Sequence, residues 1–306
     1  MTVPEQDTDE LAREFAEHRR ALVGAAYRIV GTVADAEDVV QEAWLRWADA
    51  DRSDVRDVRA YLVTVTGRLA LNKLRQQKSR RESYVGPWLP EPVATHVADP
   101  AADPELAAEM ADSVSMAMLV VLESLSPLER AAFVLREVFD LPFSEIAATL
   151  DRSEAAVRQL AHRARSHVHA RRPRQAVDRA RHAEATARFL QTANDGDVEG
   201  LISLLAPDVV LVSDGGGKKR AALRPMYGPE KVARWMIAII ERPDIADLQI
   251  RVVELNGEPA IVAYAGDAPD TVGFVEIGAD GIVSAIYLMR NPDKLGAVPR
   301  LGQLPA

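Results

Sequence analysis

Cysteine is absent from this chain of 306 residues, and aromatic residues make up only 5% of it. Without thiols, disulfides and thiolate metal sites are excluded, and a reducing compartment fits the composition. The longest apolar run, Met116 to Leu122, is far shorter than the roughly 18 residues that a membrane span needs. The start, MTVPEQDTDE, is acidic where a signal peptide would be basic and then apolar. We therefore expect a cytoplasmic protein that does not contact the membrane.

Net positive charge is found in two short stretches of an otherwise acidic chain. The formal net charge is -9, yet residues 61–82 carry +5 and residues 126–182 carry +4. The segments before, between and after these stretches are acidic. Compact basic stretches in an acidic chain indicate two surfaces that bind a polyanion, while the acidic segments face something else.

The second basic stretch has the pattern of a helix, a short helix, a turn and a long basic helix. Ser126 and Glu129 form a capping box that opens the first helix. Residues 139–142 interrupt it, Ser144 starts the short helix, and Ser153 is a suitable N-cap for the long one. This order is typical of a helix-turn-helix DNA-binding domain.

The long basic helix has one apolar stripe and one polar face. The stripe consists of Val157, Leu160, Ala161, Ala164 and Val168. Outside it lie Arg158, Gln159, His162, Arg163 and Arg165. A buried stripe and exposed guanidinium groups are what a recognition helix in the major groove needs, although a solvated basic face would have the same pattern. His162, His167 and His169 do not share one face, so we expect no metal site.

The first basic stretch, Ala60 to Arg81, predicts an amphipathic helix with a basic polar face. Directly before it, residues 35–47 predict an acidic helix, and opposite charges on consecutive helices imply different partners. Tyr61 and Tyr84 lie nearby and suit either the stacking of single-stranded bases or an ordinary core.

Three segments resemble the extracytoplasmic-function (ECF) sigma factors of bacterial RNA polymerase. DAEDVVQEAWLRW resembles their region-two signature, and RAYLVTVTGRLALNKLRQQKSRR is similar to the part that melts promoters and reads the minus-ten element. LSPLERAAFVLREVFDLPFSEIAATLDRSEAAVRQLAHRAR is similar to domain four, whose last helix reads the minus-thirty-five element. The resemblance covers roughly residues 10 to 172.

The resemblance implies two kinds of binding residue. For the clamp helices of the largest subunit of core RNA polymerase it implies Asp35, Glu37, Asp38, Gln41, Glu42 and Trp44. For promoter DNA it implies Arg68, Asn72, Arg75, Arg80 and Arg81 at the minus-ten element, and Arg158, Gln159, His162, Arg163 and Arg165 at the minus-thirty-five element.

A proline-rich linker, residues 83–112, separates the two DNA-binding domains and should be extended. Its GPWLPEP stretch places Trp88 and Leu89 between prolines, and two large apolar groups need a cover. That cover is either domain two or another domain.

Residues 175–306 predict an α+β domain. Helical patterns cover residues 177–192, 198–205 and 229–240, and residues 208–213 predict a strand. Two hairpins follow, with type I′ turns expected at Asn256-Gly257 and Asp280-Gly281. Helices packed on a curved antiparallel sheet are the expected arrangement. Its opening, FLQTANDGDVEGLISLLAPDVVLVSDGGG, resembles the SnoaL-like proteins, which are cone-shaped folds with one deep apolar pocket.

Three motifs resemble those of an ECF subgroup with a fused SnoaL-like domain: WLPEP, DGGGK and NPDKL. The resemblance implies that this domain acts in place of a separate anti-sigma protein. Because Pro292 ends the last strand, we expect the NPDKL segment to leave the sheet near its edge as an exposed segment that helps to cover Trp88. The implied regulatory residues are Trp88, Leu89, Pro90, Asp214, Gly215, Gly216, Gly217, Lys218, Asn291, Pro292, Asp293, Lys294 and Leu295.

An enzymatic role is not expected. No histidine or cysteine follows His182, so a general base would have to be a carboxylate such as Asp208 or Asp214, or a tyrosine such as Tyr227, Tyr264 or Tyr287. DGGGKK lacks the Ser or Thr that a Walker motif requires after its lysine. No cofactor is expected, although a small molecule in the SnoaL-like pocket is a candidate ligand.

The sequence therefore predicts a sigma factor with four parts: sigma domain two at 1–82, the linker at 83–112, sigma domain four at 113–174 and the SnoaL-like domain at 175–306. Two other interpretations stay open. One is a helix-turn-helix regulator that recruits polymerase without being its subunit, and the other is a ligand-processing enzyme tethered to DNA. The acidic helix favours the sigma factor, because only that class needs a polymerase-facing surface before its minus-ten helix.

Overall fold

The computed structural model describes residues 5–53, 55–94, 115–171 and 178–304. The chain divides into two compact units. The first contains residues 1–82 and 118–171, and the second contains residues 83–117 and 172–306. The linker therefore belongs to the same unit as the C-terminal domain, and each unit is described by itself.

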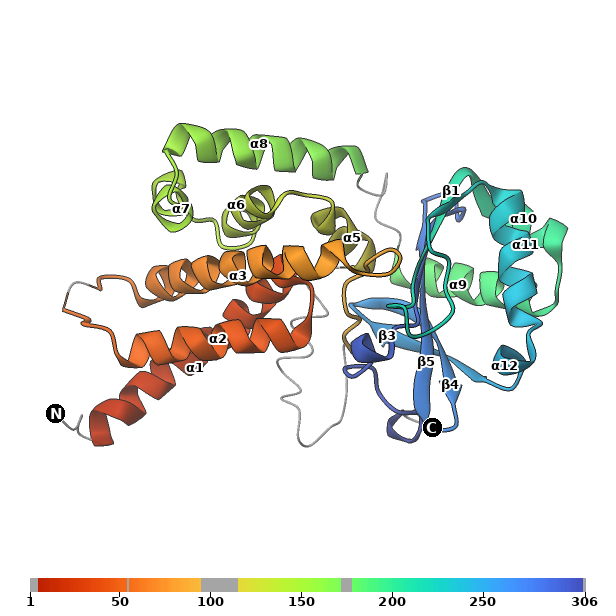
Figure 1. Ribbon diagram of the computed structural model, residues 1–306, viewed down its shortest axis with the longest axis horizontal. Coiled ribbons are helices and arrows are strands. Elements are labelled where there is room, and N and C mark those ends of the chain that lie inside the picture. Colours follow the sequence, from red (N-terminus) through yellow and green to blue (C-terminus); the bar gives the residue numbers. More distant parts are fainter. Residues whose placement is uncertain (1–4, 54, 95–114, 172–177, 305–306) are drawn as a thin grey trace. The chain divides into compact units, whose positions relative to one another are not determined.

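Three long helices begin the first unit: α1 (Glu5–Val30), α2 (Val33–Ala48) and α3 (Val58–Glu82) (Figure 1). Helices α2 and α3 correspond to the acidic and basic helices predicted from residues 35–47 and 60–81. Their shared core includes Leu22, Val40, Trp47 and Leu69, each at most 5% exposed. In α2 the buried residues Ala36, Val39, Ala43 and Trp47 recur at three- and four-residue steps, which places them on one face of the helix.

The first unit continues with four helices, α5 (Met116–Glu123), α6 (Pro127–Glu137), α7 (Phe143–Leu150) and α8 (Glu154–Arg171). The first two residues of α5 group with the second unit. Ser126 and Glu129 form the predicted capping box of α6. Ser153 caps α8 as expected, because its Oγ accepts the backbone N–H of Ala156.

The start of α7 was predicted incorrectly. The helix begins at Phe143 with Pro142 in the N-cap position, so Ser144 is already inside it. Proline fixes φ near the value that precedes a helix, and no side-chain cap is needed here. The helix ends at Asp151, whose φ of 53° lies in the left-handed region. This sharp turn directs the chain into α8.

In the second unit, α9 (Arg179–Asn194), α10 (Val198–Leu204), α11 (Pro229–Ile240) and the short α12 (Pro243–Ala246) accompany a six-stranded sheet. The strands are β1 (Leu205–Asp214), β2 (Met226–Tyr227), β3 (Gln249–Leu255), β4 (Glu258–Ala265), β5 (Ala268–Ile277) and β6 (Val283–Met289). Their order in the sheet is β2-β1-β6-β5-β4-β3. The α+β fold expected for this part of the chain is confirmed.

The sheet differs from the predicted antiparallel sheet at one pair, because β1 runs parallel to β6. Helix α10 precedes β1 in the chain and α11 follows it. The neighbouring strand β6 is distant in sequence, so no hairpin turn joins it to β1. The hairpin turn at Asn256-Gly257 has the expected positive φ at both residues, 51° and 70°. At the second hairpin only Gly281 has a positive φ, so the type I′ turn expected at Asp280-Gly281 is absent.

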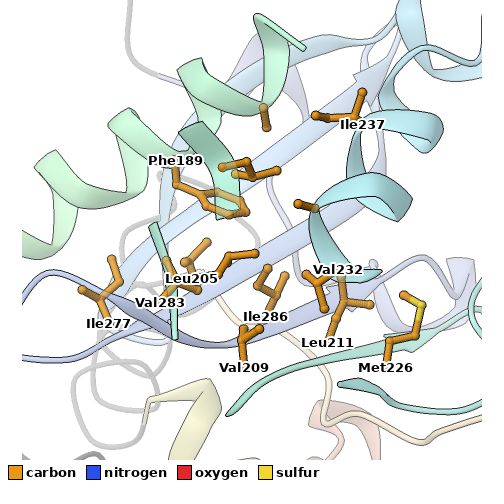
Figure 2. Close-up of a cluster of buried hydrophobic side chains, with 14 of the residues drawn as sticks. Phe189, Leu205, Val209, Leu211, Met226, Val232, Ile237, Ile277, Val283 and Ile286 are labelled. Carbon is orange, nitrogen blue, oxygen red and sulfur yellow. The ribbon is translucent and has the colours of Figure 1, made fainter. Parts of the chain in front are cut away.

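The core of the second unit lies between helices and sheet (Figure 2). Phe189 of α9 and Val232 and Ile237 of α11 pack towards Leu211 of β1 and Ile286 of β6. Alternate residues of the strands therefore point to this side, and the residues between them point to the opposite face.

The NPDKL segment was expected to be a short exposed segment near the edge of the sheet, and its exposure was wrong for three of its five residues. It follows β6, which lies between β1 and β5 in the middle of the sheet. Asn291, Lys294 and Leu295 are at most 5% exposed, whereas Pro292 and Asp293 are exposed. The segment forms the short 3-10 helix η1 (Pro292–Lys294), and a second, η2 (Leu301–Gln303), follows. Among the described helices, none is long and apolar enough to span a membrane.

Candidate functional site

Helix α2 carries the acidic residues that the sequence assigns to polymerase, and they divide into two groups. Asp35 accepts hydrogen bonds from Thr32 Oγ1 at 2.7 Å and Gln77 Nε2 at 2.5 Å, and it pairs with Lys73 Nζ at 2.9 Å. Burial alone would raise the pKa of Asp35, but the hydrogen bonds from Lys73 and Thr32 lower it below its usual value. Asp35 therefore holds α2 against α3.

The remaining residues of this set lie on the surface of α2. Asp38, Gln41 and Glu42 are exposed. Glu37 and Trp44 border a groove of about 490 Å³ between α1 and α2, where Trp44 packs edge-on against Phe15 with ring centroids 5.2 Å apart. An acidic rim beside an apolar, aromatic groove is suited to a basic, amphipathic protein surface.

Reversing charge on this rim tests its role. The double variant Asp38→Lys/Glu42→Lys should lose co-purification with core RNA polymerase by at least tenfold, because both carboxylates are exposed and take part in surface ion pairs, Asp38 with Lys73 at 3.0 Å and Glu42 with Arg46 at 2.7 Å. Glu10→Lys/Glu17→Lys makes the same charge change at exposed positions of α1 and should co-purify normally. Equal recovery of both variants would contradict the assignment of α2.

The basic residues of α3 do not form one free surface. The Arg68 guanidinium donates from Nη2 to the carbonyl of Ala148 at 2.6 Å and from Nε to that of Thr149 at 3.2 Å, both at the end of α7. Asn72 and Arg75 are exposed. The side chains of Arg80 and Arg81 lie outside the described residues. Arg68 is therefore occupied by the helix-turn-helix part of the same unit.

This contact belongs to a tight interface of α3 with α6 and α7. A Cβ on Gly67 would lie 3.0 Å from Leu135 of α6, so glycine permits the close approach. Arg130 of α6 is 2% exposed and donates to the carbonyl of Ile29 at 2.9 Å and to both oxygens of Glu123. Buried, multiply bonded arginine fixes α6 on the end of α1.

A larger side chain at Gly67 should separate the two helical parts of this unit. Because the chain has no cysteine, spin labels can be placed at Gln76→Cys on α3 and Ala155→Cys on α8. We expect Gly67→Leu to lengthen and broaden their distance distribution, since the added side chain meets Leu135. Asn72→Leu, at an exposed position of α3, should leave it unchanged. An unaltered distribution in Gly67→Leu would contradict a packed interface in solution.

Helix α8 buries its predicted apolar stripe and exposes its predicted polar face. Arg163 pairs with Glu129 at 2.8 Å and Arg165 with Glu137 at 2.6 Å, and both arginines are more than half exposed. Arg158 stacks over the Phe143 ring at 4.6 Å. Gln159 and His162 are exposed. Exposed ion pairs contribute about 0–1 kcal/mol, so phosphates can replace these carboxylates.

In the second unit, the three motifs WLPEP, DGGGK and NPDKL meet around the carboxylate of Asp214, which is fully buried. Its Oδ1 accepts the Tyr84 hydroxyl at 2.5 Å, and its Oδ2 accepts the backbone N–H of Leu89 at 2.9 Å. Lys294 Nζ lies 2.8 Å from Oδ2. Burial and the neighbouring Asp214 raise the pKa of Tyr84. The carboxylate thus binds the linker directly.

Lys294 is the matching cation and is 4% exposed. Besides Asp214 it donates to the carbonyl of Leu89 at 2.6 Å. Its Nζ lies 3.1 Å from the centroid of the Trp88 ring, so the indole covers the ammonium group. Asn291 Nδ2 donates to the Tyr84 hydroxyl at 2.8 Å. We call Tyr84, Trp88, Leu89, Asp214 and Lys294 the latch.

The glycines of DGGGK are needed for this arrangement. Gly216 has a φ of +60°, and a Cβ there would lie 2.5 Å from the side chain of Asn291. A Cβ on Gly215 would lie 2.3 Å from the carbonyl of Lys219. No other residue type fits either position without moving the turn. Lys218, by contrast, forms only an exposed ion pair with Asp293.

A second attachment of the linker lies on the β3–β4 hairpin. Val93 and Asn256 exchange two hydrogen bonds, and Ala94 forms a bridge with Leu255. Beyond residues 95–114, the backbone N–H of Met116 donates to Glu258 Oε1 at 2.8 Å. Leu255 and Glu258 are paired across the hairpin. Ala94 and Met116, which flank residues 95–115, are therefore both bonded to neighbouring residues of the β3–β4 hairpin.

Glu258 makes this attachment sensitive to pH. Burial raises the pKa of Glu258 to about 7, while the Met116 N–H opposes the shift. A carboxyl group whose pKa is raised in the folded state stabilises the fold less as pH rises from about 5 to 8. We expect Glu258→Gln to reduce the loss of melting temperature over that range. The control Glu230→Gln, at an exposed position, should leave that loss unchanged. Equal pH dependence in the wild type and both variants would contradict a raised pKa for Glu258.

In the described part of the second unit, each group that the sequence offers as a general base is either engaged or exposed. Tyr264 donates its hydroxyl to the carbonyl of Pro299, Tyr287 bonds Glu276, and Asp214 is occupied by the latch. Asp208 and Tyr227 are exposed. The apolar cavity between α9, α11 and the sheet has no acid or histidine among its described lining residues.

A helix-turn-helix domain, an acidic helix and a fused α+β domain are the parts that the sequence predicts for a transcription initiation factor. Family models for Sigma-70 region 2 and Sigma-70 region 4 match residues 15–80 and 115–168. The chain is 41% identical over 297 residues to the ECF RNA polymerase sigma factor SigJ of Mycobacterium tuberculosis, covering 94% of this chain and 93% of that protein.

Two further comparisons agree. The probable ECF RNA polymerase sigma factor SigI of Mycobacterium tuberculosis is 32% identical over 292 residues, covering 94% of this chain and 95% of that one. The crystal structure of SigJ from the same organism matches with a TM-score of 0.74 and 39% identity, covering 94% and 99% of the two chains. The chain belongs to the ECF RNA polymerase sigma factors and is a transcription initiation factor, not an enzyme.

Proposed function

We propose that this sigma factor works in the cytoplasm, binds core RNA polymerase through the surface of α2, and reads promoters with α3 and α8. The clamp helices of the largest subunit are the proposed partner of the acidic rim and groove. The support is the exposure of Asp38, Gln41 and Glu42 beside Trp44. Asp35 supports the surface from below rather than contacting the partner.

The proposed promoter contacts require the first unit to open. Elements named minus ten and minus thirty-five are about 25 base pairs apart, or ~85 Å of duplex at about 3.4 Å per base pair. With α3 packed on α6 and α7, Arg68 is held by the carbonyls of Ala148 and Thr149. Arg68 becomes available to DNA only when α3 and α7 part.

We further propose that the C-terminal domain regulates this opening in cis by holding the linker. The observation that carries the proposal is the attachment of the linker at both ends, Tyr84 to Leu89 in the latch and Val93 to Met116 on the β3–β4 hairpin. The domain thereby takes the place of a separate inhibitory protein.

Chain length gives this restraint a magnitude. Released, residues 83–117 can extend to at most about 120 Å. Attached, Tyr84 and Ala94 are at most ~36 Å apart, and Ala94 to Met116 adds only the short path through paired Leu255 and Glu258. The attached linker thus provides roughly half the reach of the free one.

Breaking the latch should alter promoter-directed transcription. Lys294→Met leaves the buried Asp214 without its cation, which costs about 3–5 kcal/mol. We expect Lys294→Met and Trp88→Ala to change run-off transcription with core polymerase at least several-fold and in the same direction. Chymotrypsin should also cleave the linker faster in Lys294→Met. The promoters would be selected from genomic fragments.

The matched control is Lys218→Met, which makes the same substitution at an exposed lysine of the DGGGK motif. It should transcribe within twofold of the wild type. If Lys294→Met and Trp88→Ala also behave as the wild type while the linker is cleaved faster, holding the linker does not regulate transcription.

A small-molecule ligand is the remaining part of the proposal. It is supported by the apolar cavity of the second unit, which lies on the helical side of the sheet.

A further inference from the structure

A cavity of about 100 Å³ lies inside the second unit between α9, α11 and strands β3 to β6. Phe189, Ile261, Val275 and Leu288 are among the side chains that line it. Protein cores usually leave few voids larger than a water molecule. An apolar cavity of about 150 Å³ stays dry and can bind benzene, so this one is near the size of a single ring.

One end of this cavity is polar, and Arg290 forms that end. The guanidinium donates from Nε to Thr271 Oγ1 at 3.0 Å, from Nη1 to the carbonyl of Arg220 at 2.9 Å, and from Nη2 to Asp270 at 2.9 Å. Arg290, Thr271 and Arg220 all line the cavity. The side chain therefore joins β5 and β6 to the loop that follows β1.

The same loop and strand lead directly to the latch. The backbone N–H of Arg290 donates to the carbonyl of Asp214 at 2.7 Å, and the next residue, Asn291, bonds Tyr84. Lys219 pairs with Asp270 at 2.7 Å, which fixes the loop between Asp214 and Arg220 from its other end. Arg290 is bonded directly to Asp214 and the loop begins at Asp214, so a displacement of either one moves Asp214.

We propose that the cavity binds a small uncharged apolar molecule of about one ring, and that its occupancy is transmitted through Arg290 and residues 214–220 to the latch. This inference rests on the proposed regulation by the linker and adds its signal. A ligand that fills the cavity contacts Thr271, Arg220 and Arg290, and its bulk shifts the hydrogen bonds that align Asp214 with Lys294.

The ligand class follows from the lining and from the local charge. The interior is almost entirely apolar, so a charged group inside would lose its hydration without a partner. Next to the polar end, Lys219 and Arg290 both pair with the carboxylate of Asp270, and Arg220 also lines the cavity. An ammonium ion is therefore repelled, and the three Arg290 donors described above are already engaged.

The four tryptophans allow occupancy and coupling to be measured separately. Trp235 lines the cavity, Trp88 belongs to the latch, and Trp44 and Trp47 lie in the first unit. In the full chain labelled with 5-fluorotryptophan, benzene and phenol should shift the fluorine-19 resonances of Trp235 and Trp88. Those of Trp44 and Trp47 should stay fixed. Benzylammonium should move none of them.

Filling the cavity provides the control. Ala263→Leu adds bulk at a lining position of β4 and should abolish both shifts, whereas Ala265→Leu, at an exposed position of the same strand, should preserve them. A shift of Trp235 without Trp88 would overturn the coupling. No shift of Trp235 at saturating benzene would overturn the site, and a shift caused by benzylammonium would overturn the ligand class. These fluorine-19 outcomes do not depend on the run-off transcription assay of Lys294→Met, so failure of this inference can be distinguished from failure of the proposed function.

Discussion

The ion pair between Lys294 and Asp214 is the constraint on which the arrangement of the second unit depends. Both groups are at most 4% exposed, and desolvating two charges is costly unless their remaining hydrogen bonds are satisfied. The linker supplies those bonds through Tyr84, the backbone of Leu89 and the indole of Trp88. The C-terminal domain therefore needs the linker to complete its own buried network, which gives a short peptide segment a specific attachment.

The second attachment converts this binding into a restraint on distance. A linker held only by the latch would still leave residues 90–117 free to extend. The bonds of Val93 and Met116 to neighbouring positions on the β3–β4 hairpin bring the ends of residues 95–115 together. Burial raises the pKa of Glu258 to about 7, so the group that accepts the Met116 N–H changes its protonation near neutral pH.

Local patterns were sufficient to predict most elements, because capping, helical periodicity and the Asn256-Gly257 turn depend on neighbouring residues. The parallel pairing of β1 with β6 and the burial of Lys294 depend on contacts distant in sequence. A lysine in a polar segment such as NPDKL is normally expected to be exposed. The burial of Lys294 is explained by its ion pair with Asp214, which the sequence alone does not reveal. Arg130 and Glu258 had no sequence signal of their own, and Asn256 was predicted as a turn residue but not as a partner of Val93. Arg68 lay in the expected helix and is exposed, but its guanidinium also contacts α7.

The contacts that restrain the two units differ in their exposure to solvent. In the first, exposed or half-exposed arginines are held by carboxylates and helix-end carbonyls, and DNA phosphates offer the same kind of partner. On the proposed function, promoter DNA competes for these contacts. In the second unit the ion pair of Asp214 and Lys294 at the centre of the latch is buried, so DNA cannot reach it, and its release requires a change inside the domain. The cavity beside Arg290 lies where such a change would reach Asp214 most directly.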